Sequence, residues 1–134
     1  MNRLYSFSIL LVAVTFLLSS CGFGDAAEKA EKQADKFHKF LKAGNETAML
    51  NMVHEDGMSS DPEAFKALMH KMATETTITK VEKTVGFNSS INNGVATVRL
   101  NYTLHDKNHG EITEEIVLQD SEDGVMKIIA LNYK

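Results

Sequence analysis

The feature that most constrains the fold is a strict alternation of apolar and polar residues over Val95–His105. Because successive side chains of a strand point to opposite faces, the alternation predicts a sheet with one face against a core. Two further strands, Glu111–Gln119 and Val125–Tyr133, follow after short loops that contain glycine, which predicts an antiparallel meander. The apolar positions of the first strand are Ala96, Val98, Leu100, Tyr102 and Leu104.

Helices are predicted before this sheet. Ala26–Lys42 carries an apolar stripe at spacings of three and four, and Ala43-Gly44 is expected to end it. A second helix is predicted over Glu46–Glu55, with Asn45 as its cap. Ser60 is expected to cap a third helix that ends near Thr74, in a capping box with Glu63.

The remaining segments complete the predicted order of helices followed by four strands. Ile78–Phe87 is predicted as a first strand at the sheet edge, and Asn88–Asn93 as a loop. This order is typical of an α+β domain, in which the helices pack on a curved four-stranded antiparallel sheet. The last strand is apolar on both faces, which suggests a central strand or one whose outer face meets a partner. Met126 and Ile128 are assigned to that outer face.

The first twenty residues have the pattern of a secretory signal. Arg3 supplies a positive charge, and the apolar run Phe7–Leu18 is shorter than the about 20 residues that span a bilayer. Leu18-Ser19-Ser20 then precedes Cys21, the only cysteine of the chain. This arrangement resembles the bacterial lipoprotein signal, and the resemblance implies cleavage before Cys21 and fatty acylation of that residue. The alternatives are an ordinary secreted protein with a free thiol or an uncleaved anchor.

The resemblance divides the chain into a signal peptide over 1–20, a lipidated tether over 21–25 and one domain over 26–134. Without Arg3, 13 basic residues remain against 18 acidic ones, a net charge of −5. This mild acidity argues against a nucleic-acid partner, which would require a basic patch. Gly22, rather than aspartate, follows Cys21. By resemblance, a Gram-negative host would place the protein on the outer membrane, facing the periplasm.

The order of elements and the final hairpins over residues 26–134 resemble the NTF2-like (cystatin-like cone) superfamily. Such domains often pair through the outer face of the sheet, and the resemblance therefore implies a homodimer or a protein partner there. The fold carries many unrelated activities and does not by itself identify a function. The expected interface residues are Arg99, Asn101, Val117, Met126 and Ile128.

Glu114 is the strongest catalytic candidate in the sequence. It shares a strand face with Ile112 and Ile116, and Tyr102 is expected on the core face one strand away. A carboxylate in a cone interior could act as an acid or base, and ketosteroid isomerases of this fold pair such a carboxylate with a tyrosine. The alternatives are that Glu114 lies at the wide mouth of the sheet or that a bulge turns it to water.

An apolar ligand is the other small-molecule hypothesis. Methionine suits adaptable apolar surfaces, so these side chains could line a cavity between helices and sheet, or simply fill the core. The candidate ligand-binding residues are Met49, Met52, Phe65, Met69 and Tyr102.

No cofactor or metal is expected. His54-Glu55-Asp56 offers oxygen and nitrogen ligands, but three consecutive residues rarely converge on one ion, and no His-x-x-x-His spacing occurs. The leading hypothesis is therefore a non-enzymatic envelope lipoprotein that binds a ligand or a protein. The alternative is a small cavity enzyme of isomerase or hydratase type that uses Glu114 and Tyr102.

Overall fold

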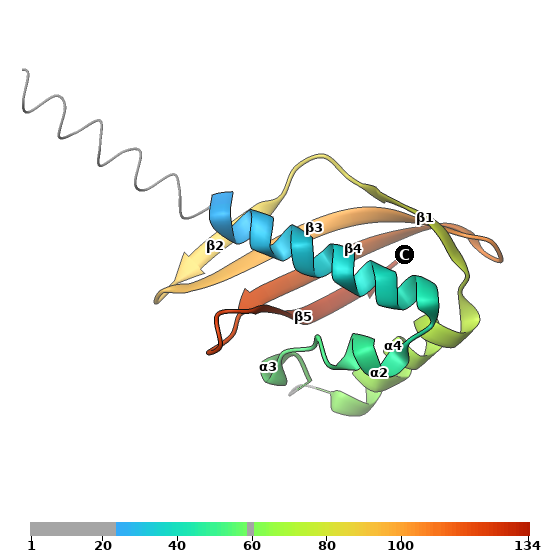
Figure 1. Ribbon diagram of the computed structural model, residues 1–134, viewed down its shortest axis with the longest axis horizontal. Helices are drawn as coiled ribbons and strands as arrows, with labels where there is room; N and C mark the ends of the chain where they lie inside the picture. Colours follow the sequence, from blue (N-terminus) through green and yellow to red (C-terminus); the bar gives the residue numbers. More distant parts are fainter. Residues whose placement is uncertain (1–23, 59–60) are drawn as a thin grey trace, which may run out of the picture.

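The predicted sheet is present with five strands rather than four. A computed structural model describes residues 24–58 and 61–134, and the predicted signal peptide and Cys21 lie outside these ranges (Figure 1). The antiparallel sheet has the order β1-β3-β4-β5, and β2 also pairs with β3. The strands are β1 (Ile78–Lys83), β2 (Asn88–Asn92), β3 (Val95–Asp106), β4 (Gly110–Asp120) and β5 (Met126–Tyr133).

The prediction of a loop over Asn88–Asn93 is wrong, because residues 88–92 form β2. This strand pairs with the first half of β3, and β1 pairs with the second half along the same edge. The connecting turn is Asn93-Gly94, where both residues have positive φ, 50° and 79°. Two such residues form the tight turn that best matches the twist of a hairpin. The polar composition of β2 is typical of a loop, whereas the Asn93-Gly94 turn is typical of a hairpin and predicts a strand on either side of it.

The last strand contains a β-bulge that changes which side chains face the core. Leu118 is opposite Ile128, but Val117 is opposite Ala130, so Ile129 is an extra residue on β5. A bulge of one residue reverses the alternation of faces. Met126 and Ile128 therefore lie in the core, together with Leu131 on the other side of the bulge. The assignment of Met126 and Ile128 to the outer face is wrong for this reason.

The helices cover the face of the sheet that carries the apolar residues of β3 (Figure 1). The N-terminal helix occupies residues 24–43 of the described chain, so the last two residues of the predicted tether are already helical. Among residues 24–58 and 61–134, no helix is both long and apolar enough to cross a membrane. The shorter helices are α2 (Glu46–Leu50), α3 (Glu55–Met58) and α4 (Pro62–Glu75).

Local signals set most of the helix ends. Gly44 has φ +65° and ends the first helix, and the Asn45 side chain accepts a hydrogen bond from the Ala48 amide at 3.2 Å. The predicted cap Ser60 lies outside the described residues. Asp61 caps α4 instead, by accepting a hydrogen bond from the Ala64 amide at 3.0 Å.

The predicted second helix is interrupted by contact with the sheet. The Ile128 amide donates to the Met52 carbonyl at 2.9 Å, and the His54 amide donates to the Ile128 carbonyl at 2.8 Å. These bonds hold Val53 beside the end strand and divide the helix into α2 and α3. A Cβ atom on Gly57 would lie 2.9 Å from the Ile128 carbonyl oxygen, so glycine allows α3 to approach β5 closely.

Asp106 stabilises the end of the sheet at the β3–β4 turn, which is the end away from α3. Its carboxylate accepts hydrogen bonds from the Thr77 amide, the His109 amide and the His109 ring. Burial alone would raise the pKa of the Asp106 carboxyl, but the hydrogen bonds from Thr77 and His109 outweigh it. The net result is a pKa below the ordinary value of 3.8.

We expect Asp106→Asn to lower the free energy of unfolding at pH 7 by about 1–3 kcal/mol, the usual range for hydrogen bonds to a charged group. The folded-state pKa of Asp106 is depressed, so its contribution is present above the unfolded pKa and is lost as the pH falls through the folded value. Urea unfolding of both proteins at pH 7 and at acid pH measures this. Asp35→Asn, at an exposed helical position, is the control; a difference that persists unchanged in acid would contradict the prediction.

Candidate functional site

A buried hydrogen bond between His38 and Glu114 joins the N-terminal helix to the sheet. His38 Nε2 and Glu114 Oε1 are 2.6 Å apart, and the two residues are 4 % and 0 % exposed. Buried histidine and glutamate side chains are uncommon in a core of this size unless they are paired. This buried pair is therefore the centre of the candidate functional site.

Two tyrosines flank Glu114 on the inner face of the sheet. Glu114 of β4 is directly opposite Tyr102 of β3 and Tyr133 of β5, so the three form a row across neighbouring strands. The alternation along β4 places Glu114 on the same side as buried Ile116. His38 reaches this row from the helix, and its ring lies 4.5 Å from the Tyr102 ring in an edge-on arrangement.

Two buried polar atoms of this group, the Tyr102 hydroxyl and Nδ1 of His38, have no hydrogen-bond partner among the described residues. The Tyr133 hydroxyl lies beside the Glu114 carboxylate, and hydrogen bonding between the two contributes to the raised pKa of Tyr133. Leaving a buried donor or acceptor unpaired costs about 1–3 kcal/mol for each group. Buried polar groups without a partner are uncommon in proteins, so these two atoms mark a place where a polar molecule could bind.

The environment keeps both tyrosine hydroxyls protonated. Burial is the main cause that raises the pKa of Tyr102, and the carboxylates of Asp35 and Glu31 add to it. Burial and the neighbouring Glu114 carboxylate also raise the pKa of Tyr133 well above its ordinary value. Both hydroxyls therefore remain neutral hydrogen-bond donors at physiological pH.

A groove of about 360 Å³ connects part of this cluster with the surface. It runs between the N-terminal helix and the edge of the sheet, and its walls include both His38 and Tyr102. The lining is predominantly basic, although Lys83 forms an ion pair with Glu31. The other residues that line the groove are Asp35, Lys39, Lys42, Val81 and Lys83.

The geometry divides the cluster into an inner and an outer part. His38 and Tyr102 line the groove and could contact a ligand, whereas Glu114 is fully buried behind them. Glu114 can orient the His38 ring through the 2.6 Å hydrogen bond, as a carboxylate does for a general base. Direct contact between Glu114 and a molecule in the groove would require a change of structure.

The structure brings Glu114 and Tyr102 together as predicted from strand parity, and it excludes the alternatives of an exposed mouth or a bulge at Glu114. Sequence reasoning missed His38 and Tyr133. His38 follows Ala34 by four residues and precedes Leu41 by three, so the apolar stripe itself marked it as facing the core. Tyr133 shares a strand face with Leu131, so the alternation along the last strand already placed it on the side opposite to the one assigned to Met126 and Ile128.

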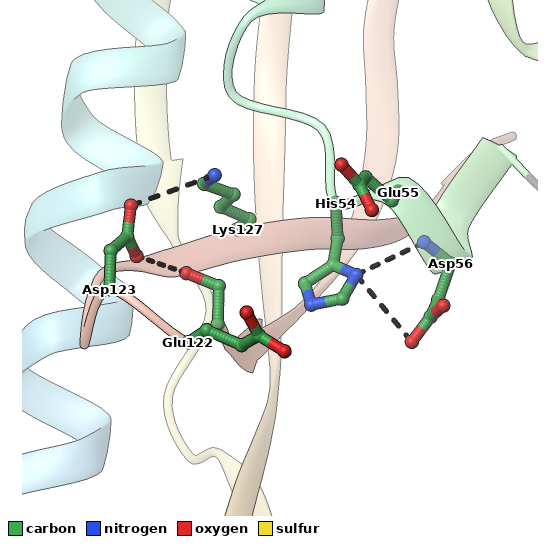
Figure 2. A pocket seen from close by; sticks show the side chains of 7 residues that line it. His54, Glu55, Asp56, Glu122, Asp123 and Lys127 are labelled. Carbon is green, nitrogen blue, oxygen red and sulfur yellow. Dashed lines mark hydrogen bonds and ion pairs between the residues drawn. The ribbon is translucent and has the colours of Figure 1, made fainter.

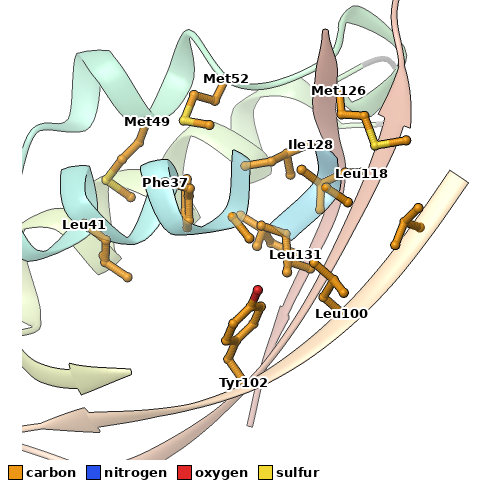
Figure 3. Packing of buried hydrophobic residues seen from close by; sticks show 14 of the residues in the cluster. Phe37, Leu41, Met49, Met52, Leu100, Tyr102, Leu118, Met126, Ile128 and Leu131 are labelled. Carbon is orange, nitrogen blue, oxygen red and sulfur yellow. The ribbon is translucent and has the colours of Figure 1, made fainter. Parts of the chain in front are cut away.

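The other candidate ligand-binding residues lie away from the groove. Met49, Met52 and Met69 are buried between the helices and the sheet, and Phe65 packs against the same cluster from α4. Figure 3 shows Met49 and Met52 above Phe37 and Ile128, whereas Tyr102 stands on the sheet with its hydroxyl toward the helix. The structure thus assigns the methionines to core packing, and only Tyr102 of this set lines the groove.

The outer face of the sheet is polar where an interface was expected. Arg99 is exposed and lies 3.8 Å from the Glu115 carboxylate, and Asn101 is opposite Glu115 in the register. Val117 is opposite Arg99 and is buried. Met126 and Ile128 are buried in the core, so the expected interface residues that remain exposed or partly exposed, Arg99 and Asn101, are polar.

A second hollow lies at the other end of the sheet and contains His54 and Asp56 (Figure 2). His54 Nδ1 accepts a hydrogen bond from the Asp56 amide at 3.1 Å, and Glu122 and Asp123 approach from the β4–β5 turn. Within residues 24–58 and 61–134, no three histidine, cysteine or acidic side chains are placed to hold one metal ion.

We expect His38→Leu and Glu114→Leu each to lower the free energy of unfolding by about 1–3 kcal/mol, because each leaves the other polar group buried and unpaired. The double variant should lose less than the sum, with a coupling energy of about 0.5–3 kcal/mol. Urea unfolding of the four proteins measures it.

The exposed pair His70–Glu46, whose side chains are 2.8 Å apart, is the matched control. Its coupling should be at most about 1 kcal/mol, as for surface ion pairs. Additive effects of the two leucine substitutions would show that the buried pair does not stabilise the helix on the sheet.

Comparison with known proteins found no relative of this chain: no protein-family model, no curated protein and no solved structure matches it.

Proposed function

We propose that this chain is an envelope lipoprotein whose domain binds a small anionic ligand in the groove at His38 and Tyr102. The lipid anchor is assigned to Cys21, on the basis of the signal pattern that precedes it. In a Gram-negative host the domain would face the periplasm from the outer membrane. The α+β architecture with an open antiparallel sheet is compatible with an NTF2-like domain, and membership of that superfamily is part of the proposal.

The observation that carries the binding proposal is the set of unmatched polar atoms at the groove. The Tyr102 hydroxyl and His38 Nδ1 are buried without a partner, and both residues line the groove. A ligand with an acceptor group could receive the Tyr102 hydrogen bond, and pairing this buried donor would stabilise the complex. Lys39 and Lys42 on the rim favour a negative charge on that ligand.

A cavity enzyme of isomerase or hydratase type is the second candidate, and the His38–Glu114 hydrogen bond favours it. In this version His38 exchanges a proton with the bound molecule, Glu114 orients the ring and Tyr102 donates a hydrogen bond to the substrate. Glu114→Gln distinguishes the two candidates. In both cases the variant should still bind the ligand. If the protein is an enzyme, the wild type converts the ligand to product and the variant does not; if it is a binding protein, neither converts it.

A protein partner or second copy on the outer face of the sheet remains a prediction. The residues that remain for it are Arg99 and Asn101, with Val117 beneath them. Their polar character favours a reversible contact rather than a permanent one.

We expect Cys21→Ser to abolish membrane association. Without the thiol no diacylglyceryl group can be attached, and the net negative charge of the domain does not favour electrostatic binding to anionic lipid. Fractionation of cells and mass spectrometry of the purified protein measure the result. An unchanged particulate fraction would contradict the anchor, but it would leave the groove untested by this experiment.

We expect native mass spectrometry of the protein, extracted in mild detergent from its own host, to reveal a bound small anion. Tyr102→Phe and Lys42→Glu should each reduce the bound fraction several-fold, because they remove a hydrogen-bond donor and a favourable charge at the groove. Lys36→Glu is the control, since it makes the same change of charge on the same helix but outside the groove lining. Equal occupancy in Lys42→Glu and Lys36→Glu, or no bound mass in the wild type, would contradict the proposal.

A further inference from the structure

Three exposed β-branched side chains lie at the end of the domain where the N-terminal helix begins. Ile91 and Val95 lie on either side of the β2–β3 turn, and Val125 follows the β4–β5 turn. Their exposed fractions are 47 %, 39 % and 42 %. Figure 1 shows both turns at the same end of the molecule as the start of the N-terminal helix. We call these three residues the apolar tip.

The turns and the start of the helix are neighbours in space. Lys29 of the helix, Val95 beside the first turn and Gly124 of the second turn line one hollow. Lys29 is only five residues from Gly24, which is about 7.5 Å along a helix. The apolar tip therefore lies close to the point where the described chain begins.

The proposed anchor restricts the distance between this end and a bilayer. Three peptide steps separate Cys21 from Gly24, and even a fully extended chain spans at most about 11 Å over that length. The helix start therefore stays within this distance of the backbone of Cys21, the residue to which the acyl chains are attached. Because the apolar tip lies beside the first turns of the helix, it is held at the lipid surface at a high local concentration.

The charge at this end selects the kind of lipid. Three ion pairs neutralise most of it: Lys29–Asp25 at 3.4 Å, Lys32–Glu28 at 2.9 Å and Lys127–Asp123 at 3.7 Å. Asp120 and Glu122 remain as additional acidic groups beside the turns. A slightly acidic surface is repelled by anionic lipid and is compatible with a zwitterionic one.

We propose that the apolar tip of Ile91, Val95 and Val125 inserts into the interfacial region of a zwitterionic bilayer when Cys21 is lipidated. This inference rests on the proposed lipid anchor. It gives the domain a fixed orientation, with the N-terminal helix leading away from the membrane. His38 is fourteen residues from Gly24, about 21 Å along the helix, so the groove remains open to the aqueous compartment.

A single introduced tryptophan tests the orientation directly, because the chain contains none. Full-length lipidated Ile91→Trp and Val95→Trp proteins are reconstituted into phosphatidylcholine vesicles with dibrominated acyl chains, which quench tryptophan within the bilayer. Asn108→Trp is the matched control, since it lies on the exposed β3–β4 turn at the other end of β3. The twelve-residue strand separates the two ends by roughly 36 Å.

We expect several-fold stronger quenching and a blue-shifted emission at both tip positions relative to Asn108→Trp. Adding Val95→Asp and Val125→Asp to the Ile91→Trp protein should remove the quenching, which separates the effect of the tip from the affinity of the probe itself. Circular dichroism checks that each variant is folded, and a variant that fails is replaced by a spin label at the same position. Adding anionic phosphatidylglycerol to the vesicles should weaken the quenching.

Each alternative outcome has a distinct meaning. A protein that floats with the vesicles but is quenched equally weakly at all positions overturns the apolar tip and leaves the anchor intact. Quenching that is lost only on dilution of the protein in the membrane, with cross-links between tips, assigns the surface to a second copy and also overturns the proposal. A protein that does not float with the vesicles contradicts the proposed anchor itself.

Discussion

The structure depends on the contact between the N-terminal helix and the inner face of β3 and β4. Ala30, Ala34 and Phe37 of the helix belong to the same buried cluster as Leu100 and Ile116 of the sheet. The hydrogen bond between His38 and Glu114 lies within the same contact. The hydrophobic core and the polar cluster therefore share one contact between helix and sheet, so the packing of the core also positions the polar side chains.

This arrangement places a polar site at the boundary between core and groove. Glu114 is held between Tyr102 and Tyr133 by strand register, which is among the most firmly specified features of a sheet with one buried face. His38 is presented by a helix that the same core fixes. Of the polar cluster, His38 and Tyr102 line the groove, whereas Glu114 is buried and hydrogen-bonds to His38 on the side away from the groove. Such a division suits binding, and it also suits proton transfer if the ligand reacts.

Several elements could be predicted because their signals are local. The alternation over β3, the glycine that ends the first helix and the Asn45 cap each depend on residues within one turn or one strand. The placement of Tyr102 and Glu114 on the inner faces of neighbouring strands also followed from parity, whereas their exact register came from the structure. By contrast, β2 is polar and exposed, so its composition indicated a loop although the Asn93-Gly94 turn specified a hairpin.

The sequence by itself determined an α+β order of elements, the inner face of β3 and the strand face that Glu114 shares with Ile112 and Ile116, because these follow from periods of two and 3.6 residues along the chain. Only the tertiary structure decided the bulge at Ile129, which moves Met126 and Ile128 into the core, and the partner of Glu114. His38 lies 76 residues from Glu114. Contacts over that separation are set by how helix and sheet pack, and no local pattern encodes them.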